Sequence, residues 1–147
     1  MTVLKVYSDG SCRNVKAANE PMGCGVYIEV DGKAVLRKSI PINSLGNSNT
    51  SEYHGLYNAI KEARIYVEEN FIYEYKVIFH VDSRFVCNQV NSMGWIRQSK
   101  YQKFKDKCEK ELSNLQATVV KWIPRAQNKE ADKLAGEARK ESMKRNG

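Results

Sequence analysis

Hydrophobic and polar positions change their period several times along the 147-residue chain. Short runs rich in β-branched residues and bounded by turn residues predict strands. Runs with apolar positions three and four residues apart predict helices. The predicted strands are Val3–Ser8, Gly23–Val30, Lys33–Ile40, Lys76–Val81 and Ala117–Ile123. The predicted helices are Thr50–Glu69, a stretch around Phe85–Val90, Ser99–Asn114 and a last helix that starts near Asn128.

The connections between these elements predict how the sheet is built. Asp31-Gly32 joins the second and third strands and is typical of a tight hairpin. Asp9-Gly10-Ser11 is expected to end the first strand, and Ser44–Asn49 to form a polar loop. The element order βββαβααβα predicts an α/β fold, in which three antiparallel strands are followed by parallel crossovers. We therefore expect a five-stranded mixed sheet with helices on both faces, and a frayed end over Met143–Gly147.

Length and composition narrow the class of protein. One domain spanning residues 1–147 suits this length, and 41% hydrophobic residues is too many for a disordered chain. No apolar run approaches the roughly 20 residues of a membrane-spanning helix, and Met1–Tyr7 lacks a secretory cleavage pattern. The four cysteines show no C-x-x-C spacing, which favours free thiols over zinc or redox chemistry. We expect a cytoplasmic monomer that does not enter membranes.

The net charge of +7 is confined to one half of the chain. Residues 1–73 contain 8 Lys/Arg and 8 Asp/Glu, whereas residues 74–147 contain 16 and 9. Such an asymmetry favours a polyanionic partner, although a basic isoelectric point is also common among small soluble proteins.

Four acids fall where the predicted topology brings them to one edge of the sheet. Asp9 and Asp82 follow strands that we expect to be parallel neighbours, and ligand sites of such sheets lie beyond the carboxyl ends of the strands. Glu52 and Asp132 lie near the starts of two helices. Carboxylates gathered this closely repel one another unless a cation compensates, and hard ions such as Mg²⁺ prefer oxygen ligands.

Each acid also has an ordinary structural interpretation. Asn49 and Glu52 have the spacing of a capping box, and Asp132 in a first turn suits the helix dipole. The two strand-end aspartates are common turn and capping residues. The metal interpretation therefore depends on the four residues taken together.

Four segments of the chain, in their order and spacing, resemble the motifs of type 1 ribonuclease H. They are Tyr7–Cys12, Asn49–Tyr53, His80–Ser83, and Ile123–Arg125 continued by Asn128–Ala135. The resemblance extends over about residues 2–142 and implies a ribonuclease H-like fold. It also implies an endonuclease that hydrolyses the RNA strand of RNA–DNA hybrids and leaves 5′-phosphate and 3′-hydroxyl ends. Two Mg²⁺ ions, with Mn²⁺ as a substitute, are the implied cofactors.

The resemblance assigns roles to individual residues. It implies that Asp9 bridges both ions, that Glu52 and Asp82 are further ligands, and that Asp132 holds the ion beside the attacking water. Glu52 is also implied to contact a ribose 2′-hydroxyl, the group that marks RNA. The remaining implied contacts to the hybrid are made by Gly10, Ser11, Cys12, Asn14, Ser48, Asn49 and Asn128.

The chain departs from the family in two places. The loop before the last helix contains no histidine, and Arg125 in that loop is a candidate electrostatic substitute at the leaving phosphate that cannot shuttle a proton. We expect His54 and His80 to be packed or surface residues rather than general bases. Members of the family carry a basic protrusion between the fourth strand and the later helices, and this chain has the short connection Asn91–Ser99 in its place.

Lysines recur at helical spacing after this connection, at Lys100, Lys103, Lys107 and Lys110. They are either a phosphate-binding ridge that replaces the protrusion or a solvated helix face. Two other functions remain open: a hybrid- or duplex-binding module without catalysis, and a related nuclease that acts on DNA.

Overall fold

The computed structural model describes residues 1–12, 19–92 and 99–146. Its five strands are Thr2–Cys12 (β1), Glu20–Val30 (β2), Lys33–Gly46 (β3), Tyr75–Val81 (β4) and Thr118–Trp122 (β5). Its α-helices are Ser48–Glu69 (α1), Arg84–Asn91 (α2), Gln102–Leu112 (α3) and Lys129–Asn146 (α4), and short 3-10 turns lie at Ser99–Tyr101 (η1) and Arg125–Gln127 (η2). The predicted element order is confirmed.

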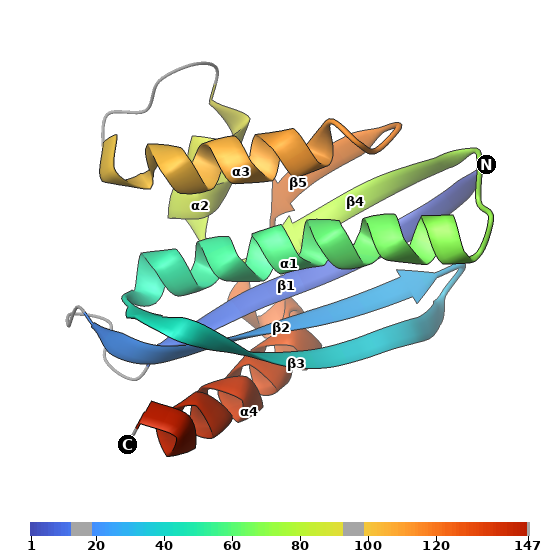
Figure 1. Cartoon of the computed structure of the whole chain (residues 1–147). Coiled ribbons are helices and arrows are strands. Elements are labelled where there is room, and N and C mark those ends of the chain that lie inside the picture. The colour runs from blue at the N-terminus through green and yellow to red at the C-terminus, as the bar shows by residue number, and fades with distance from the viewer. Residues whose placement is uncertain (13–18, 93–98, 147) are drawn as a thin grey trace.

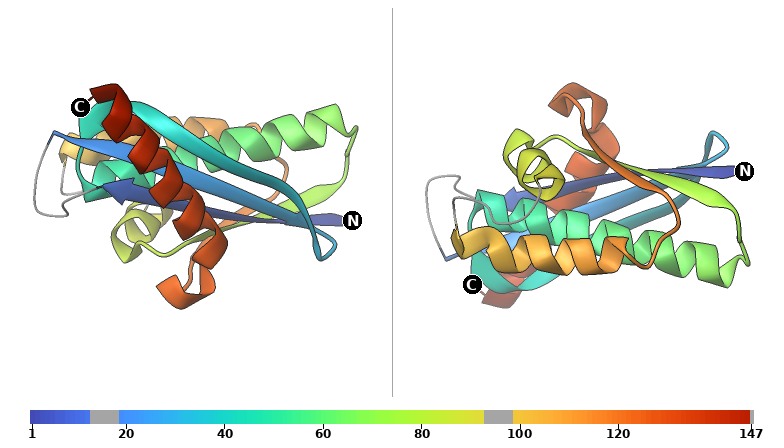
Figure 2. Two further views of the ribbon diagram at one scale, coloured as in Figure 1. Left: turned by 90° about the horizontal axis from the view of Figure 1, so that it is seen from below. Right: turned by 90° about the horizontal axis from the view of Figure 1, so that it is seen from above.

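The strands form one mixed sheet in the order β3-β2-β1-β4-β5. β2 pairs antiparallel with β1 and β3, while β4 pairs parallel with β1 and β5. Helix α1 packs across β1 and β2 with α3 beside it, and α4 packs on the other face of the sheet (Figures 1 and 2). The α/β fold with a five-stranded mixed sheet is therefore as expected.

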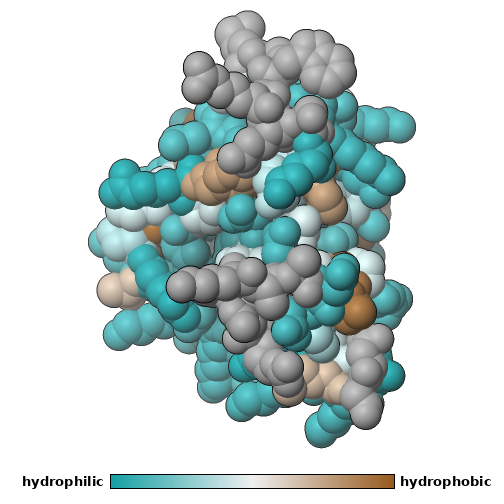
Figure 3. All heavy atoms as spheres, turned by 90° about the vertical axis from the view of Figure 1, so that its left-hand side faces the viewer, coloured by the Kyte–Doolittle hydropathy of each residue, from teal (hydrophilic) through white to brown (hydrophobic). Residues whose placement is uncertain are grey.

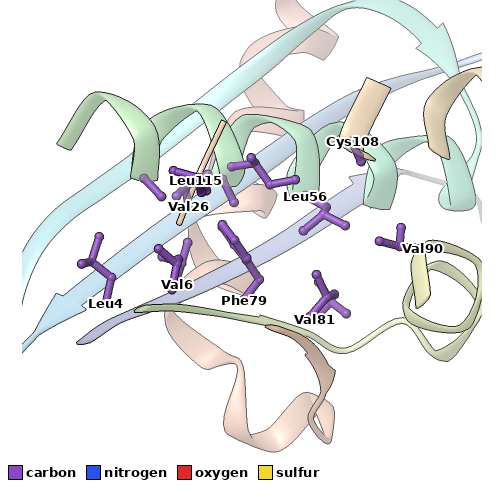
Figure 4. Close-up of a cluster of buried hydrophobic side chains, with 14 of the residues drawn as sticks. Leu4, Val6, Val26, Leu56, Phe79, Val81, Val90, Cys108 and Leu115 are labelled. Atoms are coloured by element: carbon purple, nitrogen blue, oxygen red, sulfur yellow. The ribbon is translucent and has the colours of Figure 1, made fainter. Parts of the chain in front are cut away.

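The main core fills the space between the sheet and α1. Alternate residues of the central strands point into it, including Leu4 and Val6 of β1 and Phe79 of β4, all of which are buried (Figure 4). Leu56 of α1 lies against them and is fully buried. The two-residue period of the strands and the three-to-four-residue period of the helix thus meet in one apolar layer.

Strand β1 is longer than the sequence predicts. The expected end at Asp9-Gly10-Ser11 is wrong, because β1 stays paired with β2 as far as Cys12. The parallel pairing with β4 ends earlier, at the pair Tyr7 and His80. Tertiary pairing with β2 therefore overrides the turn preference of these residues.

The start of α1 and the end of α4 also differ from expectation. Ser44–Asn49 is not a loop, because β3 continues to Gly46 and α1 begins at Ser48. The cap of α1 is Asn47, which exchanges hydrogen bonds with Thr50, so the capping box predicted at Asn49 and Glu52 is wrong. The C-terminal residues are helical up to Asn146, and this end is fixed by the buried Ser142, whose hydroxyl accepts from the amide of Ile42.

The carboxyl end of β1 and the start of α1 lie at the same end of the molecule. Viewed from that end, the described surface is mostly hydrophilic, with isolated apolar residues (Figure 3). Most of the connection Asn91–Ser99, namely residues 93–98, lies outside the described residues. None of the described helices combines the length and apolar character needed to span a membrane.

Candidate active site

Three carboxylates from three different elements meet at the edge of the sheet. Asp9 of β1, Glu52 of α1 and Asp82, which directly follows β4, each place an oxygen within 4.8 Å of the others. Asp9 is buried and the other two are half-buried. The structure thus brings together three of the four acids that the sequence singles out.

Two glycines let α1 approach β1 closely enough to form this cluster. A Cβ atom on Gly10 would lie 2.2 Å from the backbone of Ser51, and one on Gly55 would lie 2.8 Å from the carbonyl oxygen of Asp9. The amide of Gly10 donates to Asp9 Oδ1 at 3.0 Å and to Glu52 Oε1 at 3.2 Å. One backbone N–H therefore holds two carboxylates side by side.

Asp82 is oriented by groups that reach it from β5 and from the residue that follows η2. The indole Nε1 of Trp122 donates to the carbonyl oxygen of Asp82 at 3.1 Å. The buried amide of Asn128 donates to Asp82 Oδ2 at 3.0 Å and to the carbonyl oxygen of Ser8 at 2.9 Å. The cap of α2 is Ser83, whose hydroxyl accepts from Val86, so Asp82 itself is not used for capping.

Burial is the main cause that raises the pKa values of all three carboxyl groups, and neighbouring acids add to the increase. Burial is the main cause for Asp9, and the neighbouring Glu52 and Asp82 raise its pKa further. The pKa of Glu52 is also raised mainly by burial, against hydrogen bonds from Asp9 and Gly10 that lower it. The pKa of Asp82 is raised by burial although Asn128 and Arg125 oppose this. Three ionised carboxylates are therefore unstable at this edge without a compensating positive charge.

Asp132 lies outside the three-carboxylate cluster, in the first turn of α4. Its Oδ1 accepts from Nη2 of Arg125 at 3.3 Å. It is still close enough to raise the pKa values of Asp9 and Asp82. Arg125 is 80% exposed, and the acids around it raise the pKa of its guanidinium, with Asp132 as the largest cause.

The other predicted substrate contacts occupy different surroundings. The hydroxyl of Ser11 accepts from Arg139 of α4 at 3.1 Å, and the thiol of Cys12 lies 3.8 Å from the carbonyl oxygen of Gly46. Ser48 and Asn49 lie in the first turn of α1, just before Glu52 in the sequence and at the same end of the molecule as the carboxylate cluster. Asn14 lies outside the described residues.

The predicted lysine row is exposed to solvent. Lys100 lies in η1, and Lys103, Lys107 and Lys110 lie on the outer side of α3. Lys105, between them in sequence, is instead buried and pairs with Glu109.

Both histidines are packing residues, as expected. The ring of His80 stacks on Tyr7 at 4.2 Å, and its Nδ1 donates to the carbonyl oxygen of Val6 at 3.1 Å. His54 packs edge-on against Phe104 at 5.6 Å. Burial is the main cause that lowers both histidine pKa values.

The role of Asn128 in orienting Asp82 was not evident from the sequence, for which the resemblance implies only a contact of this side chain to the hybrid. Its partners lie 46 and 120 residues away in the chain. Gly55 likewise gave no signal, because a lone glycine inside a helical pattern does not reveal the strand that it contacts.

Comparisons with known proteins agree with this architecture. The family model described as reverse transcriptase-like matches residues 8–138. The Enterococcus faecalis protein named "Putative hydrolase EbsB" is 27% identical over 136 residues, which are 92% of this chain and 93% of that protein.

Solved structures of ribonucleases H share the fold. The ribonuclease H1 of Halobacterium salinarum NRC-1 superposes with a TM-score of 0.78 at 23% identity, covering 92% of this chain and 96% of that one. LC11-RNase H1 in complex with an RNA/DNA hybrid gives a TM-score of 0.82 at 22% identity, covering 95% and 99%. The N-terminal ribonuclease H domain of rv2228c from Mycobacterium tuberculosis gives 0.82 at 19% identity over 100% of both chains. The chain therefore belongs to the reverse transcriptase-like family and has the fold of type 1 ribonucleases H.

Proposed function

We propose that this protein is a ribonuclease H, an endonuclease that hydrolyses the RNA strand of RNA–DNA hybrids and leaves 5′-phosphate and 3′-hydroxyl ends. The observation that carries the proposal is the meeting of Asp9, Glu52 and Asp82 within 4.8 Å at the carboxyl edge of the sheet. Fold alone does not define an activity, whereas a carboxylate cluster at this edge supplies a site for chemistry. Among proteins of similar fold, LC11-RNase H1 has been solved with an RNA/DNA hybrid.

The residues present fit a pair of divalent cations, Mg²⁺ or Mn²⁺. All the candidate ligand atoms are carboxylate oxygens, which hard cations prefer. The positive charge of a cation would also lower the carboxyl pKa values and so oppose the effect of burial and repulsion. Oδ1 of the buried Asn128 has no hydrogen-bond partner among the described residues, and an ordered water at a cation site would supply the missing donor.

In this proposal Asp9, Glu52 and Asp82 hold the cations, with Asp132 as a further ligand on the side of the attacking water. Two divalent cations would activate the water and stabilise the leaving oxygen. Asn128 keeps Asp82 oriented through the bond at 3.0 Å. Gly10 orients the other two carboxylates through its amide.

Arg125 is the candidate for the role of the missing loop histidine. Its guanidinium is exposed beside Asp132 and stays charged, so it stabilises negative charge at the departing phosphate without transferring a proton. Substrate contacts are proposed at Gly10, Ser11, Cys12, Asn14, Ser48, Asn49 and Asn128, with Glu52 on a ribose 2′-hydroxyl. The lysines of η1 and α3 would add phosphate contacts.

One cleavage assay tests the proposal. Labelled RNA–DNA hybrid, double-stranded RNA and double-stranded DNA are incubated with the protein in Mg²⁺, in Mn²⁺ and in a chelator. We expect cutting of the RNA strand of the hybrid alone, only with a divalent cation, and 5′-phosphate ends on the products.

Two outcomes would refute it. Tight binding of the hybrid that is independent of divalent cation and never leads to cutting would identify a binding module. Cutting of double-stranded DNA in preference to the hybrid would identify a related DNA nuclease.

A further inference from the structure

A continuous row of side chains crosses the sheet on the face that carries α4. The row consists of Arg37, Tyr27, Tyr7, His80 and Lys121, which are direct neighbours on the five adjacent strands. Arg37 lies over the Tyr27 ring at 5.1 Å, the two tyrosine rings are 5.7 Å apart, and Tyr7 stacks on His80. Aromatic rings are thus flanked by a cation at each end of the row.

This part of the sheet is left bare by the helix. Helix α4 crosses the sheet diagonally, and the strands on the side of the N-terminus have no helix over them on this face (Figure 2, left). Tyr7 and Tyr27 keep part of their surface accessible there, whereas the ring of His80 is buried behind Tyr7. The rings of Tyr7 and Tyr27 therefore remain accessible to a ligand on this face.

A cleft of about 240 Å³ lies between this row and the start of α4. Tyr7, Tyr27 and Glu29 line it from the sheet, and residues 126–130 line it from the segment that leads into α4. Ligand clefts of drug-sized molecules are roughly 300–1,000 Å³, so this cleft suits a smaller planar group. The exposed Gln127 and the carboxylate of Glu29 provide hydrogen-bonding atoms at its rim.

The cleft directly adjoins the carboxylate cluster. Tyr7 lies two residues before Asp9 on the same face of β1, a separation of about 7 Å along a strand. Asn128 lines the cleft and at the same time donates to Asp82. A nucleic-acid strand that runs from the carboxylates along β1 would therefore reach the mouth of the cleft within about one nucleotide.

Charges around the cleft favour a polyanion. Lys5, Lys121 and Lys129 are exposed around it. Both acids that line the cleft have partners, because Glu29 accepts from the Tyr27 hydroxyl at 2.7 Å and lies opposite Lys5 on the neighbouring strand, and Glu130 pairs with Arg37 at 3.4 Å. Aromatic rings surrounded by cations are the usual features of single-strand binding surfaces.

We propose that this cleft, formed by Tyr7, Tyr27 and residues 126–130, binds one unpaired nucleobase of a strand that continues from the carboxylate cluster. A base inside a duplex is paired and cannot enter, so the cleft selects hybrids that end in, or adjoin, single-stranded RNA. This proposal rests on the proposed ribonuclease H function for the direction of the strand, but the binding of single-stranded RNA does not depend on cutting.

Two measurements test the cleft separately from catalysis. The first is fluorescence anisotropy of a labelled single-stranded RNA oligonucleotide in chelator, where no cutting takes place. The second is the cutting rate of a blunt hybrid compared with hybrids that have an RNA overhang at the 5′ or the 3′ side. We expect Tyr27→Ala to weaken single-strand binding roughly tenfold and to abolish the preference for one overhang, with blunt-hybrid cutting unchanged.

The controls separate stacking from folding. Tyr27→Phe retains the ring and should keep most of the binding, while Tyr73→Ala removes a 74% exposed tyrosine elsewhere and should change nothing. Gln127→Ala alters only an exposed side chain of the wall and should weaken binding without a change in melting temperature.

Two results would overturn the proposal. One is unchanged single-strand binding in both Tyr27→Ala and Gln127→Ala. The other is an equal loss of blunt-hybrid binding in these variants, which would place the duplex itself on this surface. Failure of wild type to cut any hybrid would refute the ribonuclease function and leave the binding result intact.

Discussion

The two faces of the sheet are built from the same strands but differ in what their side chains do. On the face toward α1, residues such as Leu4, Val6 and Phe79 are buried among apolar neighbours. On the face toward α4, alternate residues of the same β1 strand are Lys5, Tyr7 and Asp9.

The covering helices differ accordingly. α4 lies so close to β2 that a Cβ on Gly25 would come within 2.5 Å of the carbonyl oxygen of Ala131. It contacts the sheet through small residues and leaves the rest of that face to aromatic and charged groups. The face toward α1 therefore carries the main apolar core, whereas the face toward α4 keeps the polar, aromatic and charged side chains of the strands available for binding and chemistry.

The largest expected effect is on the chemical face. Asp9→Asn removes the central carboxylate charge and should lower hybrid cutting by at least about a thousandfold, with little loss of hybrid binding. The same change relieves repulsion with Glu52, so the metal-free protein should melt a few degrees higher. Cutting rates and thermal melting in chelator measure both effects.

A matched variant of an acid outside the cluster tests the assignment. Glu137→Gln on α4 changes an exposed acid and should leave cutting within a factor of about two. Asp9→Asn that still cuts at the wild-type rate would rule out the proposed site.

On the stabilising face, Leu56→Ala should lower the free energy of unfolding by about 3 kcal/mol. Leu56 is fully buried in the layer between α1 and the sheet. The control is Leu45→Ala on β3, where the leucine is 47% exposed and the loss should stay below about 0.5 kcal/mol. Urea unfolding measures both, and equal losses would contradict the division between the faces.

Much of this division was predictable from the sequence. The hairpin at Asp31-Gly32 formed as expected, because both residues adopt the positive φ angles that a two-residue turn needs. Asp9 and Asp82 could be placed together because the predicted parallel pairing of their strands brings their ends to one edge.

The remaining features depend on contacts between distant segments. The continuation of β1 through Gly10 is stabilised by pairing with β2, which no local preference reveals. Asn47 and Asn49 are equally good caps in sequence, and only the exchange with Thr50 selects Asn47. The orienting bond of Asn128 requires the segment before α4 to reach Ser8 of β1, so pattern alone could not assign it.

The close contact of α4 allows a test that links the two properties. Gly25→Ala places a methyl group against the backbone of α4 and should cost about 1–3 kcal/mol of unfolding free energy. It should also reduce cutting, since α4 carries Asp132 and directly follows Asn128. Gly136→Ala on the same helix has nothing within 4 Å of the new Cβ and should stabilise the protein by up to about 1 kcal/mol. We expect Gly136→Ala to cut at the wild-type rate. Equal effects of Gly25→Ala and Gly136→Ala on stability and cutting would contradict a role for the close contact between α4 and β2.

The pH dependence of stability should also separate the two faces. Carboxyl groups with raised pKa values in the folded state stabilise it most below the ordinary carboxyl pKa, near pH 4, and this contribution is lost as pH rises through the folded values, about 7 for Glu52. In chelator, the melting temperature should therefore fall from pH 6 to pH 8, and saturating Mg²⁺ should restore it.

Leu56→Ala should keep this pH dependence while Asp9→Asn reduces it. The difference between each variant and wild type cancels the opposing contribution of the histidines, whose pKa values are lowered. A wild-type protein whose melting temperature rises over this range to the same extent with and without Mg²⁺ would contradict the repulsion within the cluster.

The smallest expected effect concerns the exposed lysines of α3, which belong to neither face of the sheet. If Lys103 and Lys107 contact phosphates, each neutralised contact releases about 0.9 counterion, so a double change to Gln should reduce the salt slope of hybrid binding by roughly 1.8. Lys33→Gln at the β2–β3 turn, far from α1's start, removes an equally exposed charge and should leave the slope unchanged (Figure 1). A slope unaltered by the double change would identify the row as a solvated helix face, and phosphate binding would then have to come from groups nearer the carboxylates, such as Arg125.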